Sequence, residues 1–444
     1  MKKSLANWGN YPSMRSNEIR FEKTNQVVDF VKTHSEIISR GNGRCYGDAS
    51  LAENAVSTLN YDKVISFDNA TGVIDCEAGI TMDSILEVIV PKGWFLPVTP
   101  GTKYITIGGA VASNIHGKNH HIDGTFGNHV IDLDVLVSSG DIITCSSDLN
   151  SNLFEATLGG MGLTGIILRI KFKLKKIETS YIKQTQIKAR NLAEILDLFE
   201  KYQHSTYSVA WIDCLKTGTS SGRSILILGE NAVLDDLNDH QRLSPFPLHS
   251  KRHLTFPVNI PSFILNKYTV KAFNFAYYHK NLRQQFDSII PYDPFFYPLD
   301  IVLHWNRGYG RKGVVQYQFV LPKETSQVGL TDILQRINKK GMGSFLAVLK
   351  LFGKQESLIS FPMEGYTLAL DFPIRDGLFE FLDELDRLVL EYGGRIYLTK
   401  DARMKPEMFW GGYPNAKRFV EIVKHYNPDL KFRSLLSDRL QITI

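Results

Sequence analysis

The sequence predicts an α+β protein with two domains. A chain of 444 residues is longer than a single hydrophobic core usually supports. Up to about Lys175, short strands, turns and helices alternate, which is typical of an α+β domain. Beyond that point glycine becomes rarer, aromatic residues become more frequent, and apolar positions recur at helical spacing. We therefore expect a domain boundary between residues 175 and 180.

Capping residues and apolar periodicity predict the elements of the first part. We expect a helix over 26–33 that is capped by Asn25, and a helix that Thr81 caps and that continues to Ile89. The turn formers at 68–72 indicate a hairpin between two short strands. Strands are expected at 36–39, 64–67, 73–77, 94–98, 130–137, 142–145 and 166–172, and a short helix at 153–158.

Three glycine-rich stretches separate these elements, at 40–48, 100–130 and 159–165. Glycine costs backbone entropy, so a chain keeps it mainly where the backbone turns sharply or approaches something closely. The polar residues of 100–130 are mostly donors, which suits phosphate and ring-carbonyl oxygens, although a long surface loop is an alternative. The spacing G-x-G-x-x-x-G at 41–47 misses the dinucleotide-binding fingerprint by one residue, and no helix-like segment follows it. The three stretches together predict a cradle for one large cofactor.

Composition excludes several classes of protein. The chain is 43% apolar and 22% charged, and a net charge of +5 is too small to indicate a nucleic-acid partner. Its four cysteines are widely spaced, which predicts neither disulfides nor a metal site. The start has no apolar region of the kind a signal peptide contains. The sequence also contains no run of 18 apolar residues, so it predicts no transmembrane helix. We therefore expect a cytoplasmic protein with reduced thiols.

In the second part of the chain, the sequence predicts helices and strands, followed by a candidate catalytic pair. Helices are expected at 191–202, 331–338 and 379–390, and strands at 208–213, 224–228, 314–321 and 367–372. A further strand is expected within 395–403. If it stops near Thr399, the side chains of Tyr397 and Lys400 can reach the same site.

Residues 245–278 mix prolines, basic residues and large apolar residues and contain no acid. One interpretation is a long packed loop. The other is a surface that contacts a membrane or a lipid tail, because apolar side chains flanked by lysine and arginine suit an anionic headgroup layer.

Several motifs resemble those of one flavoprotein family. They are R-G-x-G-R-x-Y-G-D at 40–48, P-G-T-x-x-x-T-x-G-G-A at 100–110, I-H-G-K-N-H-H at 115–121, F-G-N-H-V at 126–130, G-L-T-G-I-I at 162–167 and Y-x-x-K-D-x-R at 397–403. Together they resemble the oxidase components of decaprenylphosphoryl-ribose 2′-epimerases, which are flavoproteins of the vanillyl-alcohol oxidase type. The resemblance covers essentially the whole chain.

This resemblance implies a two-domain PCMH-type FAD-binding fold. The FAD-binding domain would comprise 1–178, a substrate (cap) domain built on an antiparallel sheet would be inserted at 179–394, and 395–444 would return to the first domain. It further implies the cofactor contacts Arg40, Gly41, Asn42, Gly43, Arg44, Cys45, Tyr46, Gly47, Asp48, Ala49, Gly101, Thr106, Ile107, Gly108, Gly109, His116, Gly117, Lys118, Asn119, Ile167 and Tyr397. The substrate pocket would use Trp211, Gln316, Gln318, Lys350 and Lys400, without a metal.

Two positions depart from the family pattern. Many relatives have a histidine at the position of Arg44 that is bonded covalently to the flavin, and arginine cannot form that bond. We therefore expect non-covalent FAD. The asparagine that the family has at the position of Thr367 is missing, which affects the expected sugar contacts.

The activity implied is oxidation of a sugar's secondary hydroxyl by FAD, namely the 2′-hydroxyl of a polyprenylphosphoryl ribose. We expect Lys400 to be essential as base or hydroxyl-orienting group, with His116 and Tyr397 placing flavin and substrate, and Lys118 and Lys350 offsetting phosphate charge. A separate NADH-dependent short-chain reductase would complete the epimerisation. The alternatives are an aldonolactone or polyol oxidase that acts on a soluble sugar, and a flavin-binding scaffold without turnover.

Overall fold

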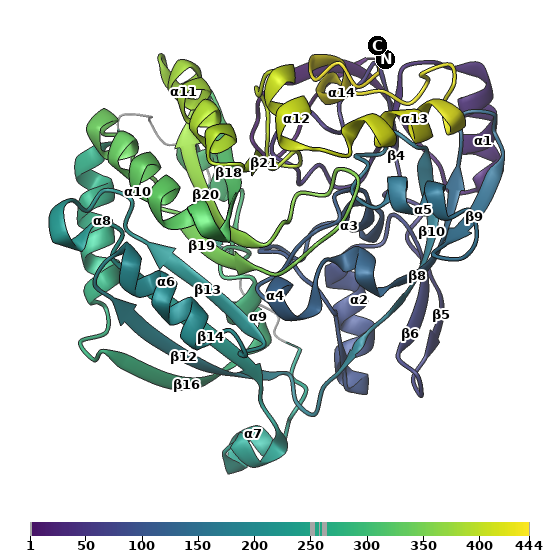
Figure 1. Cartoon of the computed structure of the whole chain (residues 1–444). Coiled ribbons are helices and arrows are strands. Elements are labelled where there is room, and N and C mark those ends of the chain that lie inside the picture. The colour runs from purple at the N-terminus through teal and green to yellow at the C-terminus, as the bar shows by residue number, and fades with distance from the viewer. Residues whose placement is uncertain (1, 249–253, 257, 260–263, 444) are drawn as a thin grey trace.

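Figure 1 shows the computed structural model of the chain, in which residues 2–248, 254–256, 258–259 and 264–443 are described. A five-stranded sheet lies on the right of the view and an eight-stranded sheet on the left. The C-terminal helices cross the top between them, close to both chain ends. This mixture of helices and largely antiparallel sheets confirms the α+β class.

The chain begins with a small four-stranded sheet in the order β1-β2-β4-β3. Its strands are β1 (Lys3–Ala6), β2 (Ser13–Arg20), β3 (Ile37–Arg40) and β4 (Asn54–Ser57), with helix α1 (Thr24–Thr33) between β2 and β3. The predicted cap of α1 was wrong: Lys23 holds the N-cap position, and the side chain of Gln26 accepts from the Lys23 amide at 3.1 Å. Because β3 ends at Arg40, the first glycine-rich turn starts directly at the sheet edge.

The five-stranded sheet has the order β5-β6-β10-β8-β9 and is antiparallel throughout. Its strands are β5 (Val64–Asp68), β6 (Val73–Glu77), β8 (Val130–Leu136), β9 (Ile142–Ser146) and β10 (Ile166–Lys173). The helices around it are α2 (Met82–Ile89), η1 (Val90–Lys92), α3 (Ile107–Ala112), α4 (His120–Asp123), η2 (Phe126–His129) and α5 (Ser151–Thr157). The predicted β5–β6 hairpin is confirmed, and so is the cap by Thr81, whose hydroxyl accepts from the Ser84 amide at 3.2 Å.

The strand predicted at 94–98 is shorter than expected. Only β7 (Trp94–Phe95) pairs, with β11 (Lys175–Lys176). Pro97 has no backbone N–H to donate, which is consistent with pairing that stops before it.

The eight-stranded antiparallel sheet has the order β16-β12-β14-β13-β19-β20-β18-β21. Its strands are β12 (Tyr181–Ala189), β13 (Tyr207–Ile212), β14 (Ser224–Asn231), β16 (Gln285–Pro291), β18 (Val314–Pro322), β19 (Ala347–Phe352), β20 (Gly365–Pro373) and β21 (Arg395–Ile396). Three amphipathic helices, α6 (Leu192–Lys201), α10 (Lys323–Lys340) and α11 (Leu378–Glu391), pack against its apolar face. The main core lies between this face and those helices, and it continues to the C-terminal helices through residues such as Phe419 and Leu436.

Two predictions in this half need correction. The strand predicted within 395–403 ends at Ile396, and the chain then turns, with the amides of Lys400 and Asp401 donating to the Tyr397 carbonyl. Residues 245–278 are not simply a loop, because helix α8 (Lys267–His279) begins after Asn266, whose side chain accepts from two amides. Within this segment, 249–253, 257 and 260–263 lie outside the described residues.

The remaining elements are short or lie near the C-terminus. They are η3 (Gly218–Ser220), η4 (Leu234–Asp236), α7 (Asp239–Arg242), β15 (Leu254–Thr255), α9 (Tyr292–Phe296), β17 (Val302–Leu303), η6 (Trp305–Tyr309), α12 (Pro406–Gly412), α13 (Ala416–Tyr426) and α14 (Leu435–Arg439). Among the described residues, no helix combines the length and apolar character that a membrane span needs.

Candidate flavin and substrate site

The turn after β3 presents backbone N–H groups that are not used by the protein. From Gly41 to Cys45, no amide donates to an acceptor in the described part of the chain. Gly43 has a φ of +58°, a conformation that glycine adopts without strain. The Arg40 guanidinium lies against Gly43 and donates to Asn7, to Ser50 Oγ at 3.1 Å and to the Ala6 carbonyl at 2.8 Å. The turn is therefore held in place from behind, with successive amides available to an anion.

The second set of predicted pyrophosphate contacts, residues 106–109, forms the start of helix α3 and lies against the first turn. A Cβ on Gly41 would be 2.2 Å from Thr106 Oγ1. Here the amides are already occupied: those of Ile107 and Gly108 donate to the carbonyls of Ile80 and Ala78, and that of Gly109 donates to Thr106 Oγ1. This turn contributes close packing rather than open N–H groups.

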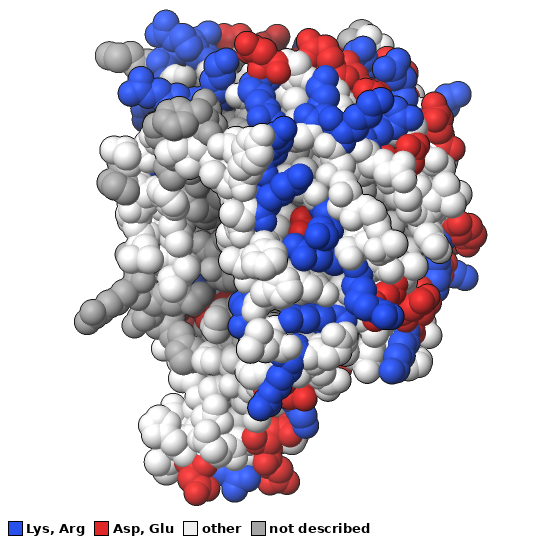
Figure 2. Space-filling model, turned by 90° about the vertical axis from the view of Figure 1, so that its left-hand side faces the viewer, with Lys and Arg blue, Asp and Glu red and all other residues white. Residues whose placement is uncertain are grey.

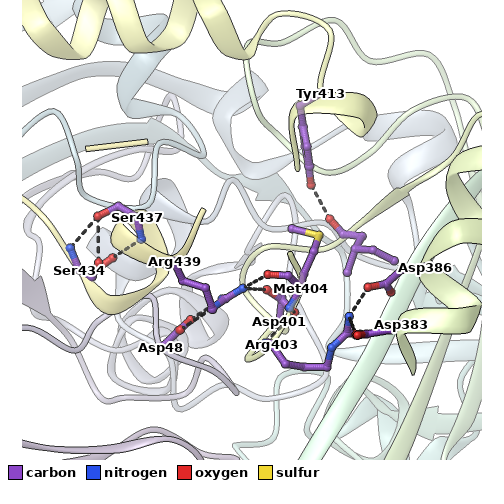
Figure 3. Close-up of polar contacts among 11 residues, drawn as sticks. Asp48, Asp383, Asp386, Asp401, Arg403, Met404, Tyr413, Ser434, Ser437 and Arg439 are labelled. Atoms are coloured by element: carbon purple, nitrogen blue, oxygen red, sulfur yellow. Dashed lines mark hydrogen bonds and ion pairs between the residues drawn. The ribbon is translucent and has the colours of Figure 1, made fainter. Parts of the chain in front are cut away.

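A chain of ion pairs fixes the first turn to the C-terminal segment (Figure 3). The buried carboxylate of Asp48 receives two hydrogen bonds from Arg439 of α14, each 2.9 Å long. Arg439 also lies 2.9 Å from Asp401, the residue after Lys400. Asp401 accepts from the amides of Arg403 and Met404. The turn that carries Lys400 is thus tied directly to the glycine-rich turn.

The series of ion pairs extends to helix α11, which packs against the eight-stranded sheet. The guanidinium of Arg403 reaches two acids of α11, Asp383 at 2.8 Å and Asp386 (Figure 3). Backbone contacts reinforce the link, since the Tyr46 amide donates to the Thr399 carbonyl at 3.1 Å. A Cβ on Gly47 would lie only 1.6 Å from the Asp401 carbonyl oxygen. Side-chain charges and glycine together set where Lys400 stands.

The predicted substrate residues share one face of the eight-stranded sheet. Strand residues two apart project from the same face, and directly paired residues do so as well. Gln316 pairs with Asp371, Lys350 pairs with Thr367, and Gln318 lies two residues from Gln316. Trp211 joins the same face through its partner Val348. The opposite face is the apolar one that the helices cover.

His116 lies over this polar face and is held by Gln318. The Gln318 amide donates to His116 Nε2 at 3.2 Å and to Thr367 Oγ1 at 3.2 Å, while the Thr367 hydroxyl donates to the Phe319 carbonyl. Burial, and then the charges of Lys350 and other neighbours, hold the pKa of His116 well below its usual value. The neutral ring therefore carries its proton on Nδ1. This atom is buried and makes no hydrogen bond within the described residues.

Tyr397 forms part of an aromatic wall beside His116. Its ring stacks on Phe361 with centroids 4.4 Å apart, and its centroid lies 5.4 Å from that of His116. Phe352 contacts His116 edge-on at 4.6 Å. Burial raises the pKa of Tyr397 to about 12, so this side chain is an uncharged surface rather than a proton acceptor. A flat apolar wall next to an open N–H donor suits a planar ring with carbonyl groups.

Lys400 stands where the glycine-rich turn meets the polar face. Its Nζ lies 4.2 Å from the centroid of the Tyr46 ring. Burial lowers the pKa of Lys400, while the nearby charge of Asp371 raises it. The Gln316 amide donates to Asp371 at 2.6 Å and to the Tyr46 hydroxyl at 3.4 Å. Lys400, Tyr46, Gln316 and Asp371 thus form one buried polar group.

Two further lysines near this group are half-buried. Lys350 has its pKa lowered to about 8 by burial and by the charge of Lys400. Lys118 donates to the Phe295 carbonyl, and burial together with the charge of Lys350 lowers its pKa to about 7. Lysines with lowered pKa values carry less positive charge at neutral pH than surface lysines do.

Other predicted cofactor residues have structural contacts here. Asn119 donates to the Pro97 carbonyl and to Asp123, and Ile167 is buried in β10. The guanidinium of Arg44 stacks on Trp8 at 4.3 Å and on Tyr104 at 5.3 Å. Gly101 has no atom within 4 Å of its Cβ position. Asn42 donates to the Tyr104 carbonyl, and the Cys45 carbonyl accepts from Trp8.

Sequence reasoning missed Asp371. It is only 1% exposed and is the single acid of β20, a strand otherwise composed almost entirely of apolar residues. The signal was present, because Asp371 is four residues from Thr367 and therefore on the same face. A lone acid on a buried strand needs a hydrogen-bond or ion-pair partner, so the sequence alone marks Asp371 as a candidate site residue.

The described residues fit a flavin dinucleotide. Five successive amides without acceptors suit a pyrophosphate, and the buried Nδ1–H of His116 beside Tyr397 suits a ring carbonyl. The open amides, the His116 nitrogen and the aromatic wall would therefore be the groups that hold such a dinucleotide.

Comparisons with known proteins agree with this chemistry. A family model described as an FAD binding domain matches residues 19–146. The decaprenylphosphoryl-β-D-ribose oxidase of Mycolicibacterium smegmatis is 35% identical over 99% of this chain and 98% of its own length. A mitochondrial D-2-hydroxyglutarate dehydrogenase of Arabidopsis thaliana is 27% identical over 43% of this chain and 38% of its own length. A putative D-arabinono-1,4-lactone oxidase of Neurospora crassa is 26% identical over 37% of this chain and 30% of its own length.

Proposed function

The chain belongs to the family of decaprenylphosphoryl-β-D-ribose oxidases, and on that premise we propose that it oxidises the 2′-hydroxyl of a polyprenylphosphoryl ribose. The product is the 2′-keto sugar, the first half of an epimerisation to the arabinose compound. FAD, when bound, supplies the hydride acceptor. The protein must then orient the sugar and take the hydroxyl proton. The observation that carries the proposal is the half-buried Lys400, which joins the open-amide turn to the polar sheet face.

Within this proposal Lys400 is the base. Burial lowers its pKa, so a fraction of the amine is neutral near physiological pH and can accept the hydroxyl proton. His116 does not compete, because its Nε2 already accepts from Gln318 and its Nδ1 carries the proton. Its role is to donate to the flavin ring, and Tyr397 supports that ring. Gln318 and Lys350 position the sugar, with Trp211 at the far end of the same face.

An anaerobic flavin assay tests this proposal. We expect polyprenylphosphoryl ribose to bleach the visible absorbance of the FAD-loaded protein, while free pentoses and aldonolactones do not. Lys400→Ala should retain FAD and its colour but bleach at least about a hundredfold more slowly, the loss typical of a missing general base. Lys405→Ala is the control, because that lysine pairs with Asp383 on the surface. Bleaching by free sugars alone would favour a soluble polyol or aldonolactone as substrate.

We also propose that FAD is held without a covalent bond. Arg44 replaces the histidine that links flavin in many relatives, and its guanidinium is stacked between two aromatic rings. Acid precipitation of the yellow protein should leave the flavin in the supernatant. Colour that stays with the precipitated protein would contradict this.

The division of the chain and its pathway partner are part of the same proposal. We assign the FAD-binding domain to 1–178 and 395–444 and the inserted substrate domain to 179–394. A separate NADH-dependent short-chain reductase would reduce the keto sugar. Adding such a reductase and NADH to the oxidation mixture should convert the ketose to the arabinose compound, while omission of the reductase should leave the ketose.

A surface around α8 supports contact with a membrane that carries the lipid substrate. On α8 only Val270 and Asn274 are buried, and large apolar side chains nearby are exposed: Leu254, Val258, Ile264, Tyr268, Phe273, Phe275, Leu282 and Phe286. Basic residues Lys267, Lys271, Lys280 and Arg283 are exposed beside them. Figure 2 shows a column of Lys and Arg side chains on this side of the molecule, next to a broad area without charge.

This surface also reaches the substrate residues. The Tyr277 ring of α8 lies 4.8 Å from the Trp211 ring, so the exposed helix is the lid of that end of the pocket. A separate cavity of about 390 Å³ is lined by Val258, Asn259, Arg307 and Arg311. Apolar side chains with a basic surround suit an anionic lipid surface.

Vesicle flotation tests the membrane contact. The FAD-loaded protein should float with vesicles rich in phosphatidylglycerol at low salt and less so in neutral vesicles or high salt. Replacing both Phe275 and Leu282 with serine should reduce flotation about tenfold or more, because two large apolar groups no longer insert. Val328→Ser on α10 is the matched control, since Val328 is equally exposed on another helix. Equal flotation of both variants would contradict the assignment.

A further inference from the structure

Asp371 is a buried carboxylate without a role in the assignments made so far. One of its oxygens accepts from Gln316 Nε2 at 2.6 Å, and the other accepts from the Tyr309 hydroxyl at 3.4 Å. Among the described residues, no lysine, arginine or histidine lies within ion-pair distance of it. A buried charge is costly unless other charges or hydrogen bonds compensate it. Burial raises the pKa of Asp371 to about 6, while the hydrogen bond from Gln316 and then the charge of Lys400 act in the opposite direction.

Lys400 is the cation that the geometry offers. The Gln316 amide that binds Asp371 also donates to the Tyr46 hydroxyl, and the Tyr46 ring carries the Lys400 amine on its face. The negative face of an aromatic ring attracts an ammonium group. Tyr46 thus links the two groups, because its ring faces the Lys400 amine and its hydroxyl shares the Gln316 amide with the carboxylate.

We propose that Asp371 is the counter-charge of Lys400: it stabilises the ammonium that forms when Lys400 takes the hydroxyl proton of the sugar. The inference rests on the proposed function. The sugar O–H bond breaks and an N–H bond forms at Lys400 Nζ, while the hydride from the carbinol carbon goes to FAD. Asp371 keeps its charge and receives no proton. It acts through Gln316 and Tyr46, so it is a positioning residue rather than a catalytic one.

The other titratable groups that face the pair do not supply this charge. Burial raises the pKa values of Cys45, Tyr46 and Tyr309, so these groups are neutral in the working range. His116 is neutral because its pKa is lowered. Lys350 is a cation with a pKa near 8 and repels the ammonium of Lys400. Asp371 is the larger of two contributions that raise the pKa of Lys400 against the effect of burial; the smaller comes from Cys45, whose own pKa burial raises.

Labelling with isotopic acetic anhydride at a series of pH values tests the pair without any substrate. Acetic anhydride acetylates neutral amines, so the pH midpoint of labelling reports the pKa of each lysine, and peptide mass spectrometry separates Lys400 from Lys350. In FAD-loaded Asp371→Asn we expect the Lys400 midpoint to fall by about one pH unit or more, because an opposite charge at this range shifts a pKa by that amount. Asp371→Glu keeps the charge and should stay near wild type.

The matched control is Asp376→Asn, which removes a fully exposed acid just beyond the same strand. It should leave the Lys400 midpoint unchanged. Gln316→Leu interrupts the bridge without removing charge and should give a smaller shift in the same direction. An unchanged or higher Lys400 midpoint in an Asp371→Asn protein that still binds FAD would overturn the inference.

A kinetic measurement separates positioning from general damage. The rate of flavin bleaching by polyprenylphosphoryl ribose should rise with pH as Lys400 loses its proton, and in Asp371→Asn this rise should move to lower pH with a lower plateau. Damage that is only structural would reduce the rate by one factor at every pH, and that result would count against the counter-charge. If no lipid-linked pentose bleaches the wild-type protein, the proposed function fails, while the labelling midpoint still decides whether Asp371 pairs with Lys400.

Discussion

The turn at 41–45 and the first turn of helix α3 at 106–109 both contain two glycines at the candidate site, but they differ in hydrogen bonding. Between Gly41 and Cys45, the amides have no acceptor in the described part of the chain. Between Thr106 and Gly109, the amides of Ile107, Gly108 and Gly109 all donate to neighbouring oxygens. In the first turn glycine leaves donors available for a ligand. In the second, it lets backbone segments approach, as Gly108 does against Ala78.

This difference separates cofactor affinity from stability. Changes that disturb the open turn should weaken FAD binding directly. Changes in the second turn should lower the free energy of unfolding by a similar amount with and without FAD. Each prediction below tests one side of that contrast, and they are ordered from the largest expected effect to the smallest.

Gly47→Ala should have the largest effect. The added Cβ would lie 1.6 Å from the Asp401 carbonyl oxygen, a backbone atom that cannot move without shifting the turn of Lys400. We expect a loss of about 5 kcal/mol or more in the free energy of unfolding, which approaches the whole stability of many domains. Thermal unfolding followed by circular dichroism, with and without FAD, measures it. A colourful, folded variant with normal melting temperature would show that the two turns are not in backbone contact.

Arg439→Met should be the next largest. It removes the cation that pairs with two buried carboxylates. Asp48 loses a bidentate ion pair, and Asp401 loses a single one. Breaking a buried pair from one side typically costs about 3 kcal/mol. We expect this loss in urea unfolding, together with weaker FAD binding, because Asp48 closes the open turn. Arg418→Met is the control, since its pair with Glu155 is at the surface and should contribute under about 1 kcal/mol.

Gly108→Ala should cost less and only in stability. Its Cβ would lie 2.9 Å from the Ala78 Cβ and 3.0 Å from the Ala78 carbonyl oxygen, so neighbouring backbone must shift slightly. Overpacking of this kind costs about 1–3 kcal/mol. We expect the melting temperature to fall by the same amount in the apo and FAD-loaded proteins. A selective loss of FAD affinity, titrated by quenching of flavin fluorescence, would mean that the second turn also contacts the cofactor.

Gly101→Ala should have the smallest effect. No atom lies within 4 Å of its Cβ position, and its φ is not in the left-handed region. The free energy of unfolding should change by less than about 0.5 kcal/mol, as for most exposed positions. If FAD affinity nevertheless falls more than about tenfold, the cofactor itself must occupy the open space beside Gly101, which would extend the binding surface to this residue.

Local sequence signals predicted the elements whose stability is itself local. The hairpin of β5 and β6 follows from its turn residues, and the start of α2 follows from the cap by Thr81. Predictions failed where longer-range contacts decide. The strand after Arg395 ends at Ile396 because the backbone of the next residues turns toward Tyr46 and the ion pairs of Asp401. The helix at α8 was missed because its apolar residues face outward and do not form an inward stripe.

By itself, the sequence determined the residue types that flavin chemistry requires and their places along the chain: glycine-rich turns after strands, a histidine and a tyrosine, and Lys400. Only the tertiary structure decided which amides stay open, which nitrogen of His116 carries the proton, and that Asp371 shares the Gln316 amide with the tyrosine that faces Lys400. The physical reason is that hydrogen bonding and charge compensation act between groups that are close in space, and those groups come from strands and turns far apart in the chain.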